Sequence, residues 1–229
     1  MTHRWDVTVP EARAIQERFR AQVERRNRFG RIRRVAGADV AFTHRHACAA
    51  VLVFSFPGLD LIETGTAIAP LTFPYVPGLL TFREGPALLK AFGALRTRPD
   101  LILFDGHGVA HPAGFGLASH MGVLLHCPSV GCAKSILVGE WDPNTLANTQ
   151  GAWMPLLHGR RRIGAGVRTR EGTKPIFVSI GHRVSLRTAI RFSLACCAGY
   201  RIPEPTRQAD IAVAYLKGEL SARDKRRKV

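Results

Sequence analysis

The chain places four acidic residues at or near the ends of its expected strands and helices. They are Asp39, Glu84, Asp105 and Asp210. Acids are otherwise scarce, with 17 Asp and Glu against 33 Lys and Arg. Carboxylates that share a site repel one another, and divalent cations offset that repulsion; two Mg²⁺ ions about 4 Å apart can clamp the attacking and leaving oxygens of a phosphodiester. These residue types therefore indicate metal-assisted phosphodiester hydrolysis, provided that the four side chains meet.

The segment around Asp105 is the most informative. The apolar run Leu101–Phe104 predicts a strand buried on both faces, and the sequence DGHG follows it. Ligands of open α/β sheets bind beyond the carboxyl ends of strands, which makes Asp105 a site candidate, although it could equally cap the next turn. A helix over 115–125 and a second buried strand follow, and Lys134 stands at the corresponding end of that strand.

Composition favours a globular protein with a polyanionic partner. The formal net charge is +16, which indicates nucleic acid, with a merely solubilising Arg bias as the alternative. The hydrophobic share of 46% and the length of 229 residues suit one domain over 1–229, with a flexible basic tail from about 219.

The cysteines and the apolar runs bear on location. Five cysteines show neither a disulfide framework nor C-x-x-C spacing, and we expect free thiols of a reducing compartment. The N-terminus lacks the apolar core of a signal peptide, and no apolar run reaches the length of a membrane span. We therefore expect a cytoplasmic protein that does not contact a membrane.

The elements before the central strand are expected as a helix over 10–28 and three strands over 32–42, 49–56 and 59–69. Short turns between these strands predict an antiparallel meander at the start of a mixed sheet, with Asp39 in its first strand. The next helix is expected from about Gly85, so that Glu84 could simply complement the helix dipole.

The loop over 73–79 contains Pro74, Pro77 and Gly78. Proline fixes its own φ and favours extended geometry in the residue before it, so we expect Tyr75 to be presented to solvent and not packed.

After Lys134 the pattern weakens. Residues 140–173 are expected as short strands and loops that form an irregular insertion over one face. Within it, Arg160–Arg162 is either a phosphate contact or a solvated face. A strand over 174–180 and a helix over 186–198 capped by Ser185 follow. Thr206 is expected to cap a last helix that carries Asp210 in its first turn.

Read together, these segments resemble the endonuclease V family, deoxyinosine-specific 3′ endonucleases. The resemblance covers nearly the whole chain and rests, in order, on VAGADVAF, PYVPGLLTFREGPALL, PDLILFDGHGVAHP, GLASHMGVLL, SVGCAKS, GHRVS and PEPTRQAD. It implies an α/β fold, a ribonuclease H-like mixed sheet (antiparallel meander plus parallel strands) flanked by helices, in a single endonuclease V domain.

The resemblance also implies roles position by position. Asp39, Glu84 and Asp105 match the family's metal-binding carboxylates, and Asp210 matches a fourth position where members carry Asp or His. Lys134 matches a lysine beside the metal site, and all five are expected to act in catalysis. The implied cofactor is Mg²⁺, with Mn²⁺ as a substitute.

Substrate binding is implied for a second set of residues. Tyr75 matches the residue that fills the gap beside the lesion when the altered base is turned out. The remaining residues of this set are Pro77, Gly78, Leu80, Gly106, Gly108, His111 and Gly131. For His111, a hydrogen-bonded structural role is the alternative.

The implied activity is DNA repair. The enzyme would recognise deoxyinosine and hydrolyse the second phosphodiester bond 3′ to it, leaving 3′-hydroxyl and 5′-phosphate ends, and it would act as a monomer. A ribonuclease that cleaves inosine-containing single-stranded RNA is the alternative. A catalytically silent nucleic-acid-binding protein is a third hypothesis, which the intact set of acids disfavours.

Overall fold

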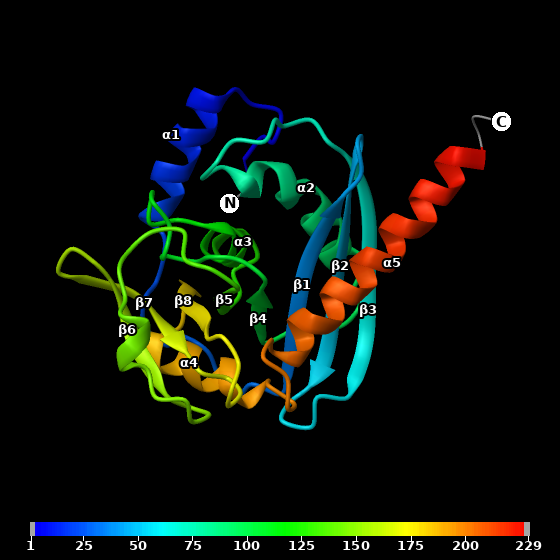
Figure 1. The fold of residues 1–229 in the computed structure, drawn as a ribbon. Helices are drawn as coiled ribbons and strands as arrows, with labels where there is room; N and C mark the ends of the chain where they lie inside the picture. The colour runs from blue at the N-terminus through cyan, green and yellow to red at the C-terminus, as the bar shows by residue number, and fades with distance from the viewer. Residues whose placement is uncertain (1–2, 227–229) are drawn as a thin grey trace.

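The apolar runs of the chain pair into one mixed sheet of eight strands (Figure 1). The computed structural model describes residues 3–226. The strand order is β3-β2-β1-β4-β5-β8-β7-β6. The strands are β1 (Arg34–Phe42), β2 (His46–Ser55), β3 (Leu61–Pro70), β4 (Leu101–Phe104), β5 (Ser129–Ala133), β6 (Trp153–His158), β7 (Arg161–Val167) and β8 (Ile176–His182).

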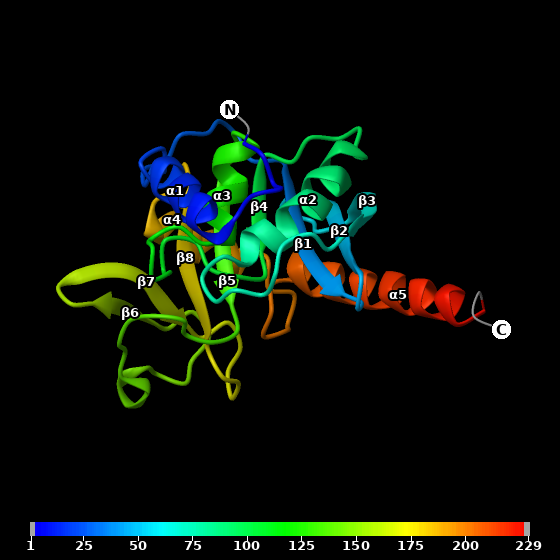
Figure 2. The same cartoon turned by 90° about the horizontal axis from the view of Figure 1, so that it is seen from above.

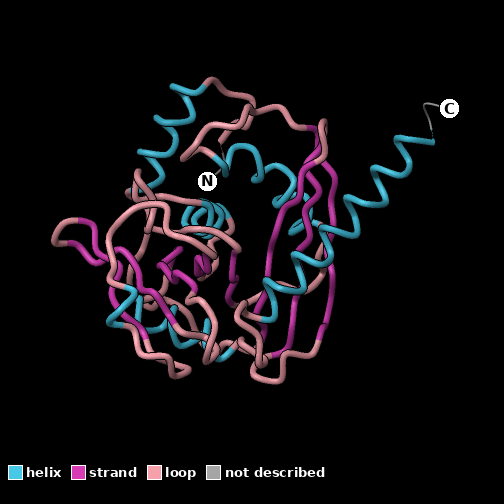
Figure 3. Tube along the Cα trace, viewed as in Figure 1, coloured by secondary structure: helices cyan, strands magenta, loops and turns pink. Residues whose placement is uncertain are grey.

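Helices cover both faces of the sheet. They are α1 (Val9–Arg20), α2 (Leu80–Gly93), α3 (Leu117–Leu124), α4 (Leu186–Ala195) and α5 (Glu204–Arg226), with a single 3₁₀ turn, η1 (Pro143–Thr145), between β5 and β6. Figure 2 shows β1 to β3 between α2 on one side and α5 on the other. In Figure 3 the loops that join the helices to the strands are drawn in pink.

The expected fold class is confirmed. Strands β1, β2 and β3 form an antiparallel meander, whereas β1, β4 and β5 run parallel to one another. Alternate strand residues face opposite layers: Val35 and Leu103 pack in the layer with α4 and α5, and Ala36 and Ile102 pack in the layer with α2 and α3. The carboxyl ends of the parallel strands therefore lie together at one end of the sheet, between the two layers of helices.

Two helix boundaries differ from expectation. Helix α1 ends at Arg20 and not at residue 28, because residues 24–28 pair with the backbone of Arg183 instead. Helix α2 begins at Leu80, five residues before the expected start at Gly85. Gly85 is a packing glycine, since a Cβ there would lie 2.2 Å from the indole ring of Trp5.

The short strands expected over 140–173 are confirmed, but the segment is not an insertion over one face: it forms the hairpin β6–β7, which extends the sheet at its edge. Glycines weaken the strand signal in the sequence, and the structure shows why they are present. A Cβ on Gly164 would lie 2.7 Å from the carbonyl oxygen of Val178. The residues of Arg160–Arg162 are exposed at the hairpin turn.

The C-terminal segment also differs. Helix α5 begins at Glu204, so Thr206 lies inside it, and its hydroxyl donates to the carbonyl oxygen of Pro203. Residues 219–226, expected as a flexible tail, continue this helix, which agrees with their good helix formers; residues 227–229 lie outside the described part.

Ser185 caps α4 as expected, because its hydroxyl accepts from the backbone N–H of Thr188. All five cysteines are free. Within residues 3–226, no helix combines the length and apolarity needed to cross a bilayer.

Candidate active site at the carboxyl ends of the parallel strands

Strand pairing brings two aspartates side by side. Ala38 on β1 lies opposite Phe104 on β4 in the parallel ladder, so Asp39 and Asp105, the next residues, stand on neighbouring strands. Adjacent strands are about 4.8 Å apart, which puts the two carboxylates within strong electrostatic range. Asp105 does not cap a helix or turn; its carboxylate pairs with Lys134.

Helix α2 contributes the third carboxylate. Glu84 is the fifth residue of α2, its side chain is buried, and it interacts electrostatically with Asp39 and Asp105. The alternative in which Glu84 only complements the start of a helix is therefore wrong, because α2 begins one turn earlier.

Helix α5 and strand β5 complete the set. Gly37 allows the start of α5 to lie directly on β1, since a Cβ there would clash with the backbone of Pro205, and this contact positions Asp210 one turn further along. The Nζ atom of Lys134 lies 2.5 Å from Oδ2 of Asp105 and 4.0 Å from Oδ2 of Asp210. The five residues expected to act in catalysis are thus neighbours.

Burial and mutual repulsion perturb this group. Burial, followed by the charge of Asp105, raises the pKa of Asp39 to about 7. Burial and the charges of the two aspartates likewise raise the pKa of Glu84 well above its ordinary value. Burial lowers the pKa of Lys134, but its hydrogen bond to Asp105 and the nearby carboxylates outweigh burial and raise it. Negative charge at this site is therefore incompletely compensated.

The donor chemistry suits a hard divalent cation, because the acidic groups that interact with Asp39 are the carboxylates of Asp105 and Asp210. Within residues 3–226, however, no three Asp, Glu, His or Cys side chains converge closely enough to hold an ion as they stand. The ammonium of Lys134 is instead the counter-charge of Asp105. Metal binding would require the carboxylates to turn toward a common point.

The loop between β3 and α2 presents Tyr75 as expected. Tyr75 is 70% exposed, whereas Phe73 and Leu79 on either side are buried in a small core with Phe82. The loop is therefore anchored at both ends, and its tip projects into solvent beside the carboxyl ends of the strands.

Gly78 and His111 meet beside this loop. Gly78 has φ +82°, a conformation that favours glycine, and the carbon that would be its Cβ lies 3.6 Å from the His111 ring. His111 is buried, its Nδ1 accepts from the N–H of Ala113, and burial lowers its pKa to about 4. His111 is thus a neutral, hydrogen-bonded histidine; contact with a substrate remains a prediction.

Glycines make the floor of the same region. A Cβ on Gly131 of β5 would lie 2.5 Å from the backbone nitrogen of Gly108 and 2.6 Å from the carbonyl oxygen of Gly106. The loop after β4 therefore lies directly on β5, and the hydroxyl of Ser179 accepts from the N–H of Gly108. Pro77 and Leu80 flank Gly78 on the loop side, and Leu80 is 39% exposed.

Sequence reasoning missed two residues that fix these parts. The Gln16 side-chain amide donates to the carbonyl oxygens of Gly78 (2.9 Å) and Phe115 (3.0 Å). The Arg201 guanidinium donates to the carbonyl oxygen of Lys134 (3.0 Å). Gln16 could have been found, because it interrupts the apolar face of α1, whereas nothing in the sequence marks Arg201.

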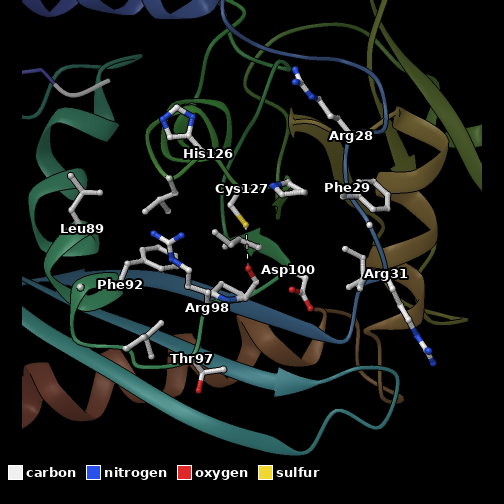
Figure 4. A pocket seen from close by; sticks show the side chains of 18 residues that line it. Arg28, Phe29, Arg31, Leu89, Phe92, Thr97, Arg98, Asp100, His126 and Cys127 are labelled. Carbon is white, nitrogen blue, oxygen red and sulfur yellow. Dashed lines mark hydrogen bonds between the residues drawn. The ribbon is translucent and has the colours of Figure 1, made fainter.

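A large cavity lies elsewhere. It has a volume of about 650 Å³ and is lined by the segments that precede β1, β4 and β5, at the opposite ends of the parallel strands (Figure 4). It contains none of the acidic residues described above. We place the chemistry at the carboxylates because perturbed ionisation, and not volume, identifies a reactive site.

Comparisons with known proteins identify the family. The Endonuclease V family profile matches residues 17–211. A protein named Endonuclease V from Roseiflexus castenholzii is 53% identical over 208 residues, covering 91% of this chain and 93% of its own length. The crystal structure of Endonuclease V from Streptomyces avermitilis matches with a TM-score of 0.90 and 42% identity over 95% of this chain and 96% of that one. Endonuclease V from Ciona intestinalis, crystallised with a 24-mer DNA containing an inosine followed by a ribo-adenosine, matches with a TM-score of 0.81 and 27% identity over 93% of this chain and 98% of that one.

Proposed function

The chain belongs to the endonuclease V family and is a nuclease, and on that premise we propose that it is a Mg²⁺-dependent repair enzyme that acts on deoxyinosine in DNA. It hydrolyses the second phosphodiester bond 3′ to the deoxyinosine and leaves 3′-hydroxyl and 5′-phosphate ends. The inosine-containing DNA bound by the Ciona relative supports the substrate class.

One observation carries the proposal: a buried carboxylate, Glu84, and the half-buried carboxylates of Asp39 and Asp105 come from separate elements to one end of the sheet beside Lys134, inside a protein of net charge +16. A strongly basic surface attracts a polyanion, and an acidic centre within it has no role in holding phosphate directly. Such a centre supports binding of a divalent cation between protein and phosphodiester.

In this proposal Asp39, Glu84 and Asp105 hold Mg²⁺, with Asp210 as a further oxygen ligand. Mg²⁺, when bound, stabilises the charge that develops on the phosphate and promotes ionisation of water. Lys134 keeps its proton because carboxylates surround it, and its ammonium offsets phosphate charge.

Lesion recognition is assigned to the loop of Tyr75 and to the glycine floor. Hypoxanthine pairs weakly and costs less to extrude than a normal base, and Tyr75 would take the place that it leaves. Gly131 allows the loop after β4 to pack directly on β5, and the backbone N–H and C=O groups of that loop would then lie close to the base and exclude a purine with an added amino group.

Inosine in RNA is the second candidate substrate. The DNA bound by the Ciona relative carries a ribo-adenosine after the inosine, so one ribonucleotide is compatible with a relative's site. Discrimination depends on contacts to the 2′-hydroxyl. Matched DNA and RNA oligonucleotides, compared by initial rate, decide between the two substrates.

The test is cleavage of an end-labelled duplex with one deoxyinosine, in Mg²⁺ and in EDTA. We expect one cut, two phosphodiesters 3′ of the inosine, whose downstream product is ligatable and thus carries a 5′-phosphate. An uncut strand in both Mg²⁺ and Mn²⁺, or an equal rate in EDTA, would refute the proposal.

A further inference from the structure

A second pocket adjoins the carboxylates. It has a volume of about 480 Å³, and Lys134 forms part of its wall, so that it opens beside the ammonium paired with Asp105. In Figure 1 the loop before β8 (yellow), which lines this pocket, lies at the bottom, and the loop between β3 and α2 (teal) lies at the top. The carboxyl ends of β4 and β5 lie between the two loops.

The pocket is cationic. Four basic side chains line it, and no Asp or Glu does: Lys134, Arg168, Lys174 and Arg201. Within the described residues, only Lys134 of these four makes an ion pair. Uncompensated positive charge in a concave site favours an anionic ligand.

Aromatic rings stand in the same wall. Trp141 lies against Gly166 of β7, where a Cβ would be 2.9 Å from the indole, and it meets Phe177 edge-on with ring centroids 5.3 Å apart. The indole is therefore held in place by strands of the sheet while it lines the pocket. A fixed aromatic ring beside cations is the arrangement that binds a base and its phosphate.

Backbone contacts fix the walls in advance. The Arg201 guanidinium donates to the carbonyl oxygens of Lys134, Lys174 (2.8 Å) and Pro175 (2.9 Å), which ties the loop before β8 to the end of β5. The Arg168 guanidinium donates to the carbonyl oxygen of Thr173. A preformed pocket loses little entropy on binding.

We propose that this pocket holds the nucleotide on the 3′ side of the scissile bond, with its base on Trp141 and its phosphate near Lys174. The inference rests on the proposed function, in which the cut lies 3′ of the altered base. The glycine floor at Gly131 and the pocket wall at Lys134 are three residues apart on the β5 side, about 10 Å of strand. Because the loop of Tyr75 and this pocket lie on opposite sides of the carboxyl ends of β4 and β5, a strand that binds at that loop and passes the carboxylates leaves through this pocket.

The experiment compares two deoxyinosine substrates that differ at one position. The first nucleotide 3′ of the cut carries either a normal base or an abasic analogue, so that the phosphates are unchanged. For the native protein we expect KM to be about tenfold higher on the abasic strand, in the range that base–aromatic stacking gives. Trp141→Ala should raise KM about tenfold on the normal strand, and removal of the base should then cause no further loss.

The control is Trp153→Ala, which removes a 43% exposed tryptophan outside the pocket and should leave KM and the abasic effect unchanged. Circular dichroism checks that each variant folds. If Trp141→Ala does not fold, Lys174→Ala carries the test: it should raise KM about threefold and lower the salt slope of binding by about one. Arg98→Ala, the same charge change at the other end of the sheet, should do neither.

The outcomes separate the two claims. If the native protein cuts neither substrate, the proposed function fails. If it cuts both with the same KM, the nuclease stands and the pocket assignment is overturned. A Trp141→Ala protein that folds and keeps the full abasic effect also overturns the assignment.

Discussion

Strand β4 carries an aspartate at each end, and the two stand in opposite electrostatic settings. At its amino end, Asp100 accepts hydrogen bonds from the backbone N–H groups of Arg33 and Arg34 and from the Arg34 guanidinium. These bonds outweigh burial and lower the pKa of Asp100. At its carboxyl end, Asp105 lies beside Asp39. Burial and the charge of Asp105 raise the pKa of Asp39 to about 7.

The difference between the two ends of β4 indicates which feature identifies a reactive site. The amino end has the larger cavity, about 650 Å³, but its half-buried carboxylate, Asp100, is hydrogen-bonded and paired with Arg34, as expected of a structural role. The carboxyl end keeps carboxylates that repel one another, which costs stability in the absence of a cation. Proteins retain such groups where function requires them.

The largest expected effect separates the two aspartates by activity. Asp105→Asn should lower the cleavage rate on a deoxyinosine duplex by about 10³-fold or more, since a metal-bound carboxylate supports several kcal/mol of charge stabilisation. Asp100→Asn should leave the rate per folded molecule within about twofold, because the paired charge at that end has no part in the chemistry. Comparable losses in both variants would show that the two ends do not differ as described.

A second prediction concerns the exposed loop at the carboxyl end. Tyr75→Ala should weaken binding of the deoxyinosine strand by about 1–3 kcal/mol, because a base-sized ring no longer stacks. Tyr215→Ala is the matched control, since Tyr215 is 71% exposed and Tyr75 is 70% exposed. Binding is measured by fluorescence anisotropy with the labelled strand. Equal affinities for the two variants would show that Tyr75 does not take part in lesion recognition.

The third prediction concerns stability instead of activity, and here Asp100 is the residue expected to matter. Asp100→Asn should lower the free energy of unfolding by about 1–3 kcal/mol, because the hydrogen-bonded charge is lost. The folded-state pKa of Asp100 is lowered, so its contribution is present above the ordinary aspartate pKa of about 4 and is lost on acidification. The destabilisation should therefore be clear in thermal melts at pH 7 and should shrink at pH 3. A difference that does not change with pH would contradict the pairing.

The fourth prediction uses pH at the carboxyl end. Asp39 holds a proton below about pH 7, and that proton must leave before the carboxylate can bind a cation. The apparent affinity for Mn²⁺ should rise by at least about tenfold per pH unit as the pH approaches 7, because Asp39 releases its proton and Glu84, whose pKa is also raised, releases another. Calorimetric titration at several pH values measures this, and an affinity that stays constant from pH 6 to 8 would count against Asp39 as a ligand.

The smallest expected effect is the change in stability on replacing Asp39, which is opposite in sign to the change on replacing Asp100. Because the pKa of Asp39 is raised on folding, the folded protein binds this proton more tightly than the unfolded chain, and stability falls as pH rises from about 4 to 7. Asp39→Asn removes the penalty and should raise the melting temperature in EDTA at pH 8 by about 2–4 °C per kcal/mol recovered. A lower melting temperature would show that the Asp39 charge is stabilising.

Much of the fold and the site could be predicted because the signals are local. The apolar run of β4 and the DGHG that follows it place Asp105 at a sheet edge from sequence alone. The prolines around Tyr75 predict its exposure. That these side chains are neighbours could not be derived from spacing, since Asp39 and Asp210 are brought together by the contact of α5 with β1.

The remaining features depend on partners distant in sequence. The sequence predicts a helix start at about Gly85, yet Gly85 is required by Trp5, and α2 begins at Leu80. The glycines of β7 weaken its strand signal because they make room for neighbours, such as Trp141 on Gly166. Gln16 and Arg201 bind backbone carbonyl groups, which have no sequence signature.

Metal binding in the absence of substrate tests whether a metal centre lies at the carboxyl ends of the parallel strands. Mn²⁺ binding to the purified protein at pH 8 can be measured by electron paramagnetic resonance for the native protein, Asp105→Asn and Asp100→Asn. We predict saturable binding that Asp105→Asn weakens at least tenfold, for loss of one charged ligand, and that Asp100→Asn leaves unchanged. Equal binding by all three proteins, or no binding by any, would contradict a metal centre at the carboxyl ends of the parallel strands.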